Sequence, residues 1–238
     1  TPMTIDDDIH YSRTELSKGI PYVASTFDEM SGTTVGLALR LDDVLPMHYV
    51  YLSALPALLS QSGLYVDGVP LKYADMRERM RREIQGLNAY YSVNADARRY
   101  ELVVRGQGLT PEESRHALDW MSNLLYHVDW RPENLPRMRE VVDQMLKGLR
   151  NTMQGSEEGW VHDPAGAWRR QRDRLFLTTS SFLTREHNLL RLRWLLQDVD
   201  GVDDTAALGQ AFDKLAESGR GSKRGAVEIL MKLLSGET

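Results

Sequence analysis

The sequence predicts an α+β protein, in which an antiparallel sheet has helices packed on one face and the C-terminal part is helical. The chain of 238 residues is 42% apolar and 26% charged, as globular chains are, and it is long enough to bury a substantial core. Strand-like and helix-like runs follow one another in the order β-β-α-α-β-β-α-α, with only helices after residue 163. This order describes an antiparallel sheet covered by helices on one side.

The N-terminal part is expected to be a linker or arm, residues 1–20, followed by two strands. The arm contains a run of aspartates starting at Asp6 and has few apolar positions. β-prone residues then fill two runs, 22–27 and 33–41, and the second alternates apolar and polar residues. Because the residues between the runs have turn chemistry, the runs are predicted to form a hairpin or to be joined by a short loop.

Two helices are expected next. Apolar residues at helical spacing fill residues 48–62, where Pro56 should kink the helix and Gly63 should end it. A strongly charged helix with one apolar face follows at 72–85 and stops at Gly86.

The clearest hairpin lies in the middle of the sequence. Two alternating runs, 88–95 and 99–105, are joined by a short polar segment around Ala97. Gly106 and Gly108 follow the second run and loosely resemble a phosphate-binding loop. Since neither G-x-G-x-x-G nor G-K-[ST] is present, these glycines are attributed to turn chemistry.

A capping box opens the helix that follows this hairpin. Thr110 and Glu113 have the spacing of the box, and Pro111 occupies the first helical position. The inner face of this helix is predicted to carry Ala117, Leu118, Met121, Leu124 and Leu125. A further helix runs to about residue 153, with Leu135, Met138, Val142, Met145 and Leu149 inward.

The C-terminal part is expected to be helical throughout, at 164–176, 183–197, 204–217 and 223–235. We interpret residues 21–155 as the α+β core and residues 156–238 as a truncated helical part of the same domain. The chain begins at Thr1 without an initiator methionine or the features of a signal peptide. We therefore expect it to be a piece of a longer polypeptide.

Charge and composition argue against several classes of partner. The net charge of −5 offers no basic excess for nucleic acid. The longest apolar stretch, 44–66, is interrupted by Pro46 and Pro56 and makes a poor membrane span, so no membrane partner is expected. The absence of cysteine excludes disulfides and thiolate sites but leaves both a cytoplasmic and a periplasmic location open.

Short motifs along residues 20–155 follow a recognisable order. Gly63-Leu64 is followed by Leu71-Lys72-Tyr73, then by the strand that begins at Gly86, and then by Tyr100-Glu101-Leu102. In this order and spacing the chain resembles one repeat of the pitrilysin, insulin-degrading enzyme and presequence peptidase family of zinc metallopeptidases. In an active repeat of that family, a strand leads into a helix that carries an inverted H-x-x-E-H zinc motif.

The same resemblance implies that this repeat has lost its zinc site. Counted back from Gly63, the two zinc histidines would fall at Ala54 and Leu58 and the general-base glutamate at Ala57, while the last glutamate ligand would fall at Met145. An inverzincin site needs two imidazoles, a carboxylate and a third ligand, and none of these residues supplies one. No cofactor is expected in this chain, and zinc is implied for the parent enzyme.

The resemblance implies a function without catalysis in this chain. We expect a non-catalytic domain that scaffolds the peptide-binding chamber of a zinc metallopeptidase. Its partners would be other repeats of the same polypeptide or a catalytic subunit, together with unfolded peptide. The alternative is a stand-alone α+β interaction domain unrelated to proteolysis.

Two further sets of residues are candidates for contacts. Tyr90, Tyr91 and Asn94 lie on the strand that runs beside the peptide in an active repeat, although cross-strand packing explains the same residues. An interdomain contact is the second candidate, and its residues are Trp160, Trp168, Arg169, Arg170 and Trp194. For the tryptophans core packing is the equal alternative, and for the arginines a solvated helical face.

Histidine offers no metal site in this sequence. No two of the six histidines lie three or four residues apart on a predicted helix. We expect them to be surface residues.

Overall fold

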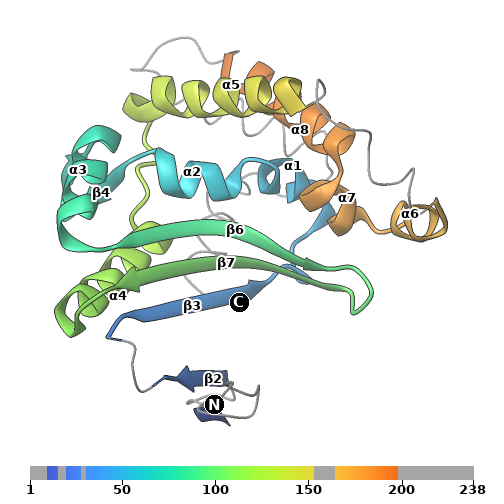
Figure 1. Cartoon of the computed structure of the whole chain (residues 1–238). Coiled ribbons are helices and arrows are strands. Elements are labelled where there is room, and N and C mark those ends of the chain that lie inside the picture. Colours follow the sequence, from blue (N-terminus) through green and yellow to red (C-terminus); the bar gives the residue numbers. More distant parts are fainter. Residues whose placement is uncertain (1–9, 16–19, 28–30, 153–163, 198–238) are drawn as a thin grey trace.

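The main sheet has three antiparallel strands. The computed structural model describes residues 10–15, 20–27, 31–152 and 164–197. In these residues β3 (Thr33–Arg40), β7 (Arg99–Gly108) and β6 (Gly86–Asn94) are hydrogen-bonded in the order β3-β7-β6 (Figure 1). The predicted central hairpin is confirmed as β6–β7, and the α+β class with an antiparallel sheet is confirmed with it.

Helices cover one face of this sheet. On β7 the buried residues alternate, with Leu102 and Val104 almost fully buried beneath α2 (Leu55–Gln61) and α4 (Pro111–Tyr126). Alternation follows from the strand geometry, because successive side chains point to opposite faces. The other face carries mostly polar and small residues, together with Tyr90 and Val103, and remains largely exposed.

A second layer of helices lies beyond the first. Figure 1 shows α5 (Leu135–Thr152) and α8 (Phe182–Gln197) on the side of α1 (Tyr49–Leu52) and α2 that faces away from the sheet. Two apolar clusters fill the two spaces between the three layers. The side-chain amide of Asn188 on α8 also donates to the Ser53 hydroxyl, at 3.0 Å, where α1 meets α2.

The predicted helix at 48–62 is divided rather than kinked. A short 3₁₀ turn, η2 (Pro46–His48), leads into α1, and the helix is interrupted at Ser53 and Ala54 before α2 begins. Pro56 lies in the first turn of α2, where its missing N–H removes no helical hydrogen bond. Gly63 ends α2 with a positive φ of 92°, as expected.

A small hairpin that was not predicted follows α2. Strands β4 (Leu64–Val66) and β5 (Val69–Leu71) are joined by Asp67 and Gly68, whose φ angles are 51° and 80°. Positive φ at both central residues is typical of a type I′ turn, and Asp-Gly is its usual sequence signal. The charged helix α3 (Tyr73–Glu83) comes next, with Met76 and Met80 buried.

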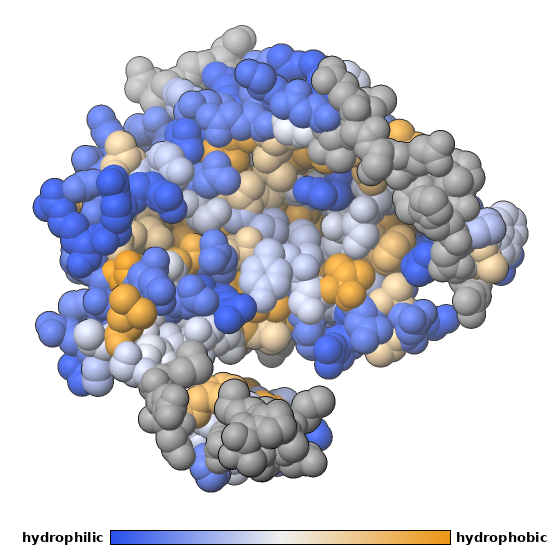
Figure 2. All heavy atoms as spheres, in the orientation of Figure 1, coloured by the Kyte–Doolittle hydropathy of each residue, from blue (hydrophilic) through white to orange (hydrophobic). Residues whose placement is uncertain are grey.

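Of the two alternatives for the runs 22–27 and 33–41, the hairpin is not formed. β2 (Pro21–Thr26) pairs with β1 (His10–Glu15), which lies inside the expected linker, and β3 pairs with β7 instead of β2. β1 has almost no apolar residues, so its sequence shows no alternation. It is identified as a strand by its pairing with β2. Figure 1 shows the β1–β2 hairpin apart from the main sheet, and Figure 2 shows hydrophobic residues at its surface.

The capping box of α4 is confirmed, although the bond back from Glu113 goes to Leu109, one residue before the cap. Thr110 Oγ1 accepts the Glu113 N–H at 3.1 Å, while the Glu113 carboxylate accepts the N–H of Leu109 at 2.8 Å. The inner face differs in one residue. Leu118 is 48% exposed because the buried stripe passes instead through Trp120, whose Nε1 donates to Glu83 at 2.8 Å.

Removal of this cap should have a measurable cost. Thr110→Ala should lower the free energy of unfolding by about 1 kcal/mol, because a helix N–H loses its acceptor. Urea denaturation measures the change. Ser122→Ala, at an exposed interior position of α4, is the matched control and should not lower stability. Equal midpoints for the wild type and Thr110→Ala would show that water replaces the cap.

The C-terminal part divides earlier than predicted. The expected helix at 164–176 is two helices, α6 (Pro164–Arg170) and α7 (Arg174–Ser180), because Asp173 caps α7 through the N–H groups of Leu175 and Phe176. The helix expected at 183–197 is confirmed as α8. The helices expected at 204–217 and 223–235 lie outside the described residues. In the residues described, no helix is both long and apolar enough to cross a membrane.

Candidate functional site

The positions that the resemblance aligns with a zinc site lie together in the structure. Ala54 and Leu58 are buried in the apolar cluster between α1–α2 and α5, and Ala57 and Met145 are half-buried at its margin. Met138, Val142 and Leu189 complete the surroundings with further apolar side chains. The described residues of this cluster fill the site by packing and include no histidine or carboxylate.

Helix α2 separates this cluster from the core under the sheet. Leu55 and Leu59 belong to the sheet-side cluster, and Leu58 belongs to the cluster with α5. The division follows from helical geometry, because residues three or four apart share a face, while Leu58 and Leu59 point in different directions. The face of α2 toward α5 therefore carries the positions of interest.

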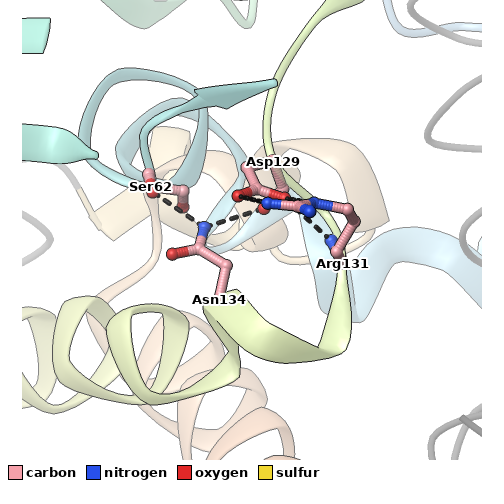
Figure 3. A network of polar contacts seen from close by, with 4 residues as sticks. All are labelled: Ser62, Asp129, Arg131 and Asn134. Carbon is pink, nitrogen blue, oxygen red and sulfur yellow. Dashed lines mark hydrogen bonds and ion pairs between the residues drawn. The ribbon is translucent and has the colours of Figure 1, made fainter. Parts of the chain in front are cut away.

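A polar network joins the ends of α2 and α5 beside this cluster (Figure 3). The side-chain amide of Asn134 donates to the carbonyls of Ser62 and Asp129, both at 2.8 Å. Asp129 is 6% exposed, and its carboxylate accepts two hydrogen bonds from the Arg131 guanidinium, at 2.8 and 3.0 Å. Charge-assisted bidentate pairs of this kind have a fixed geometry. The network holds the start of α5 against the end of α2 and has a structural role.

Metal donors are not grouped in the part of the chain that the structure describes. No three residues among its histidines, aspartates and glutamates could together hold a metal ion. His48 corrects one expectation, since it is buried and stacks on Tyr51 with ring centroids 6.3 Å apart. Burial lowers the pKa of His48, which keeps its imidazole neutral and suited to packing.

The three residues expected to contact peptide have different surroundings. The Tyr91 hydroxyl donates to the Leu52 carbonyl at 2.5 Å, and Asn94 Oδ1 accepts the N–H of Ala97 at 2.9 Å in the hairpin turn. Tyr90 is 41% exposed on the opposite face of β6. Tyr90 therefore offers an exposed aromatic ring, whereas Asn94, also exposed, uses its Oδ1 within the turn.

Two of the three tryptophans expected at an interdomain contact lie among the described residues. Trp168 and Trp194 are 63% and 58% exposed, so core packing does not account for them. Trp160 and the side chain of Arg169 lie outside the described residues. Arg170 is half-buried, and it lines a cavity together with Arg98, to which no sequence signal pointed. This cavity joins segments far apart in the sequence, which is why sequence analysis missed it.

Comparison with protein-family models and with curated proteins finds no match for this chain. The function of the chain is therefore inferred from its own residues and their geometry.

Proposed function

We propose that this chain is a non-catalytic domain of a pitrilysin-family zinc metallopeptidase, which scaffolds the chamber where unfolded peptides are bound. One observation carries the proposal. The residues aligned with the two zinc histidines, the general base and the last ligand are Ala54, Leu58, Ala57 and Met145, and all four adjoin one apolar cluster where α2 meets α5. Two helices that would meet at a metal in an active repeat meet here through packing.

The sheet offers a way to hold peptide. Of the described strands, β7 alone pairs with β6, so the other edge of β6 has no strand beside it. An extended peptide can add to such an edge through main-chain hydrogen bonds, which makes the binding tolerant of sequence. Tyr90, exposed on β6, supplies an aromatic surface next to that edge. These features support a chamber wall for unfolded peptide.

The alternative is a stand-alone interaction domain. The β1–β2 hairpin favours it, because the hairpin lies apart from the main sheet and its residues Tyr11 and Val23 are exposed. The complete reading frame separates the two proposals. An H-x-x-E-H motif several hundred residues upstream in the same frame would support the peptidase parent, and a frame confined to these residues would support the alternative.

The isolated chain should bind an unfolded peptide without cleaving it. We expect no stoichiometric zinc after dialysis and no hydrolysis of a fluorogenic unfolded peptide. The fluorescence anisotropy of a labelled unfolded peptide should rise when the chain is added. The physical reason is that Ala54, Ala57, Leu58 and Met145 supply neither ligand nor base, while the edge of β6 remains available.

A pair of tyrosine variants tests the site of binding. Tyr90→Ala should weaken peptide binding several-fold, whereas Tyr126→Ala should not, because Tyr126 is similarly exposed but lies on α4. One zinc per chain or chelator-sensitive turnover would contradict the non-catalytic role. Absence of any peptide binding would contradict the scaffold role.

A further inference from the structure

A polar cavity lies where the β6–β7 turn approaches the connection between α6 and α7. Its volume is about 620 Å³, within the range of ligand-binding pockets. Four arginines and two aspartates contribute to its lining: Arg98, Arg170, Arg172, Arg174, Asp96 and Asp173. Figure 2 shows a hydrophilic surface in this region, where the turn lies below α6 in the view of Figure 1.

One of the two carboxylates in the cavity lining, that of Asp173, is engaged by the protein itself. Asp173 Oδ1 accepts the N–H groups of Leu175 and Phe176, both at 3.1 Å, and its Oδ2 accepts the Tyr100 hydroxyl at 2.5 Å. These bonds leave the Asp173 carboxylate little capacity for a guanidinium. Burial raises the pKa of the Tyr49 and Tyr100 phenols at the cavity wall, so they add no negative charge.

The positive charge is less engaged. Other arginines, such as Arg79 and Arg131, form ion pairs with a carboxylate at 2.7 and 2.8 Å. Within the described residues no carboxylate lies within ion-pairing distance of Arg98, Arg172 or Arg174. Several like charges gathered around one cavity repel one another, and an anion placed among them would remove that cost.

Two of the arginines are oriented by aromatic rings. The Arg172 guanidinium lies over the Trp168 ring and the Arg170 guanidinium over the Phe176 ring, each 5.7 Å from the centroid. A guanidinium that lies over an aromatic ring can still offer its N–H groups to a planar, bidentate acceptor such as a carboxylate. Arg98 has a positive φ of 49°, the left-handed conformation that commonly closes a hairpin loop, so the turn fixes the position of its backbone.

We propose that this cavity binds acidic side chains of an unfolded peptide through Arg98, Arg172 and Arg174. The proposal rests on the proposed function and adds a preference for acidic segments. Ala95 and Asp96 follow directly on β6, so a peptide paired with the edge of β6 reaches the cavity at the end of that strand. A carboxylate is the anion that the side chains of an unmodified peptide supply, and its planar shape matches the N–H edge of a guanidinium.

A matched pair of peptides tests the charge preference. One labelled peptide contains Glu among Ala and Ser, and its counterpart has Gln in place of each Glu. At low salt the Glu peptide should bind the chain about ten-fold more tightly, since each charge-assisted hydrogen bond contributes measurably to affinity. Added salt should reduce the difference.

Arginine variants test the location. Arg172→Gln with Arg174→Gln should abolish the preference by weakening binding of the Glu peptide to the level of the Gln peptide. Arg105→Gln is the control, because Arg105 is exposed on the outer face of β7, away from the cavity, and should keep the preference. Circular dichroism of each variant checks that it remains folded.

The outcomes separate this inference from the proposed function. Equal binding of both peptides, or a preference that survives in the double variant, would overturn the acidic site while leaving peptide scaffolding intact. Inorganic phosphate that displaces the Glu peptide at concentrations where acetate does not would also overturn it, in favour of a phosphate site. Binding of neither peptide would contradict the proposed function as well.

Discussion

Leu58→His combined with Met145→Glu should destabilise the protein by about 3 kcal/mol or more and should not create a zinc site. Leu58 is 9% exposed within the apolar cluster between α2 and α5, and Met145 lies at the margin of the same cluster. An imidazole and a carboxylate placed there would lose water without gaining partners, because the neighbouring side chains are apolar. Urea denaturation measures the stability, and metal analysis after dialysis measures zinc.

Conservative replacements at the same positions provide the control. Leu58→Met with Met145→Leu keeps both the volume and the polarity and should cost less than about 1.5 kcal/mol per site. If the polar double variant unfolded at the wild-type urea concentration, the cluster would not be a packed core. One zinc per chain in that variant would show that the position still has the geometry of a metal site.

Gly108→Ala should be the most damaging small change in the sheet. A Cβ at Gly108 would lie 2.4 Å from the Ser114 nitrogen and 2.6 Å from the Glu113 carbonyl carbon, both backbone atoms in the first turn of α4. Relief would require α4 to move away from β7, which would disturb the capping box. We expect a loss of about 3 kcal/mol or more in the free energy of unfolding.

Gly36→Ala is the matched control for this change. Gly36 lies in β3 of the same sheet, and a Cβ there would have no heavy atom within 4 Å. This substitution should therefore be neutral or slightly stabilising, because it reduces the entropy of the unfolded chain. Denaturation curves for both variants decide the matter. Equal stability of the two variants would mean that α4 does not press on β7 as closely as the structure places it.

The parts of the fold that sequence predicted are those specified by neighbouring residues. The β6–β7 hairpin is specified by its alternation, and the start of α4 by Thr110 and Glu113. Gly106 and Gly108 show the limit of such signals, because they were attributed to a turn but lie in β7, where the absence of a side chain lets α4 approach. The pairing of β3 with β7 likewise joins segments more than sixty residues apart and leaves no local signal.

The two candidate sites likewise differ in how far the sequence predicted them. The positions aligned with the zinc motif were located by counting from Gly63, and α2 and α5 bring them together through apolar side chains that are visible in the sequence. Of the four arginines that line the cavity, only Arg170 was a candidate in the sequence. Arg170, Arg172 and Arg174 lie close together in sequence, but Arg98 and Tyr100 reach them through the fold. Sequence analysis therefore named Arg170 as a contact candidate but could not show that it lines a cavity.

Helix α8 closes one side of the apolar cluster around Leu58. Leu189 and Leu192 of α8 are 0% and 5% exposed in the cluster with Leu58, and Asn188 bonds to Ser53. A molecule that approached Leu58 from this side would have to displace α8. New donor side chains on α2 and α5 alone would therefore leave the cluster closed on that side.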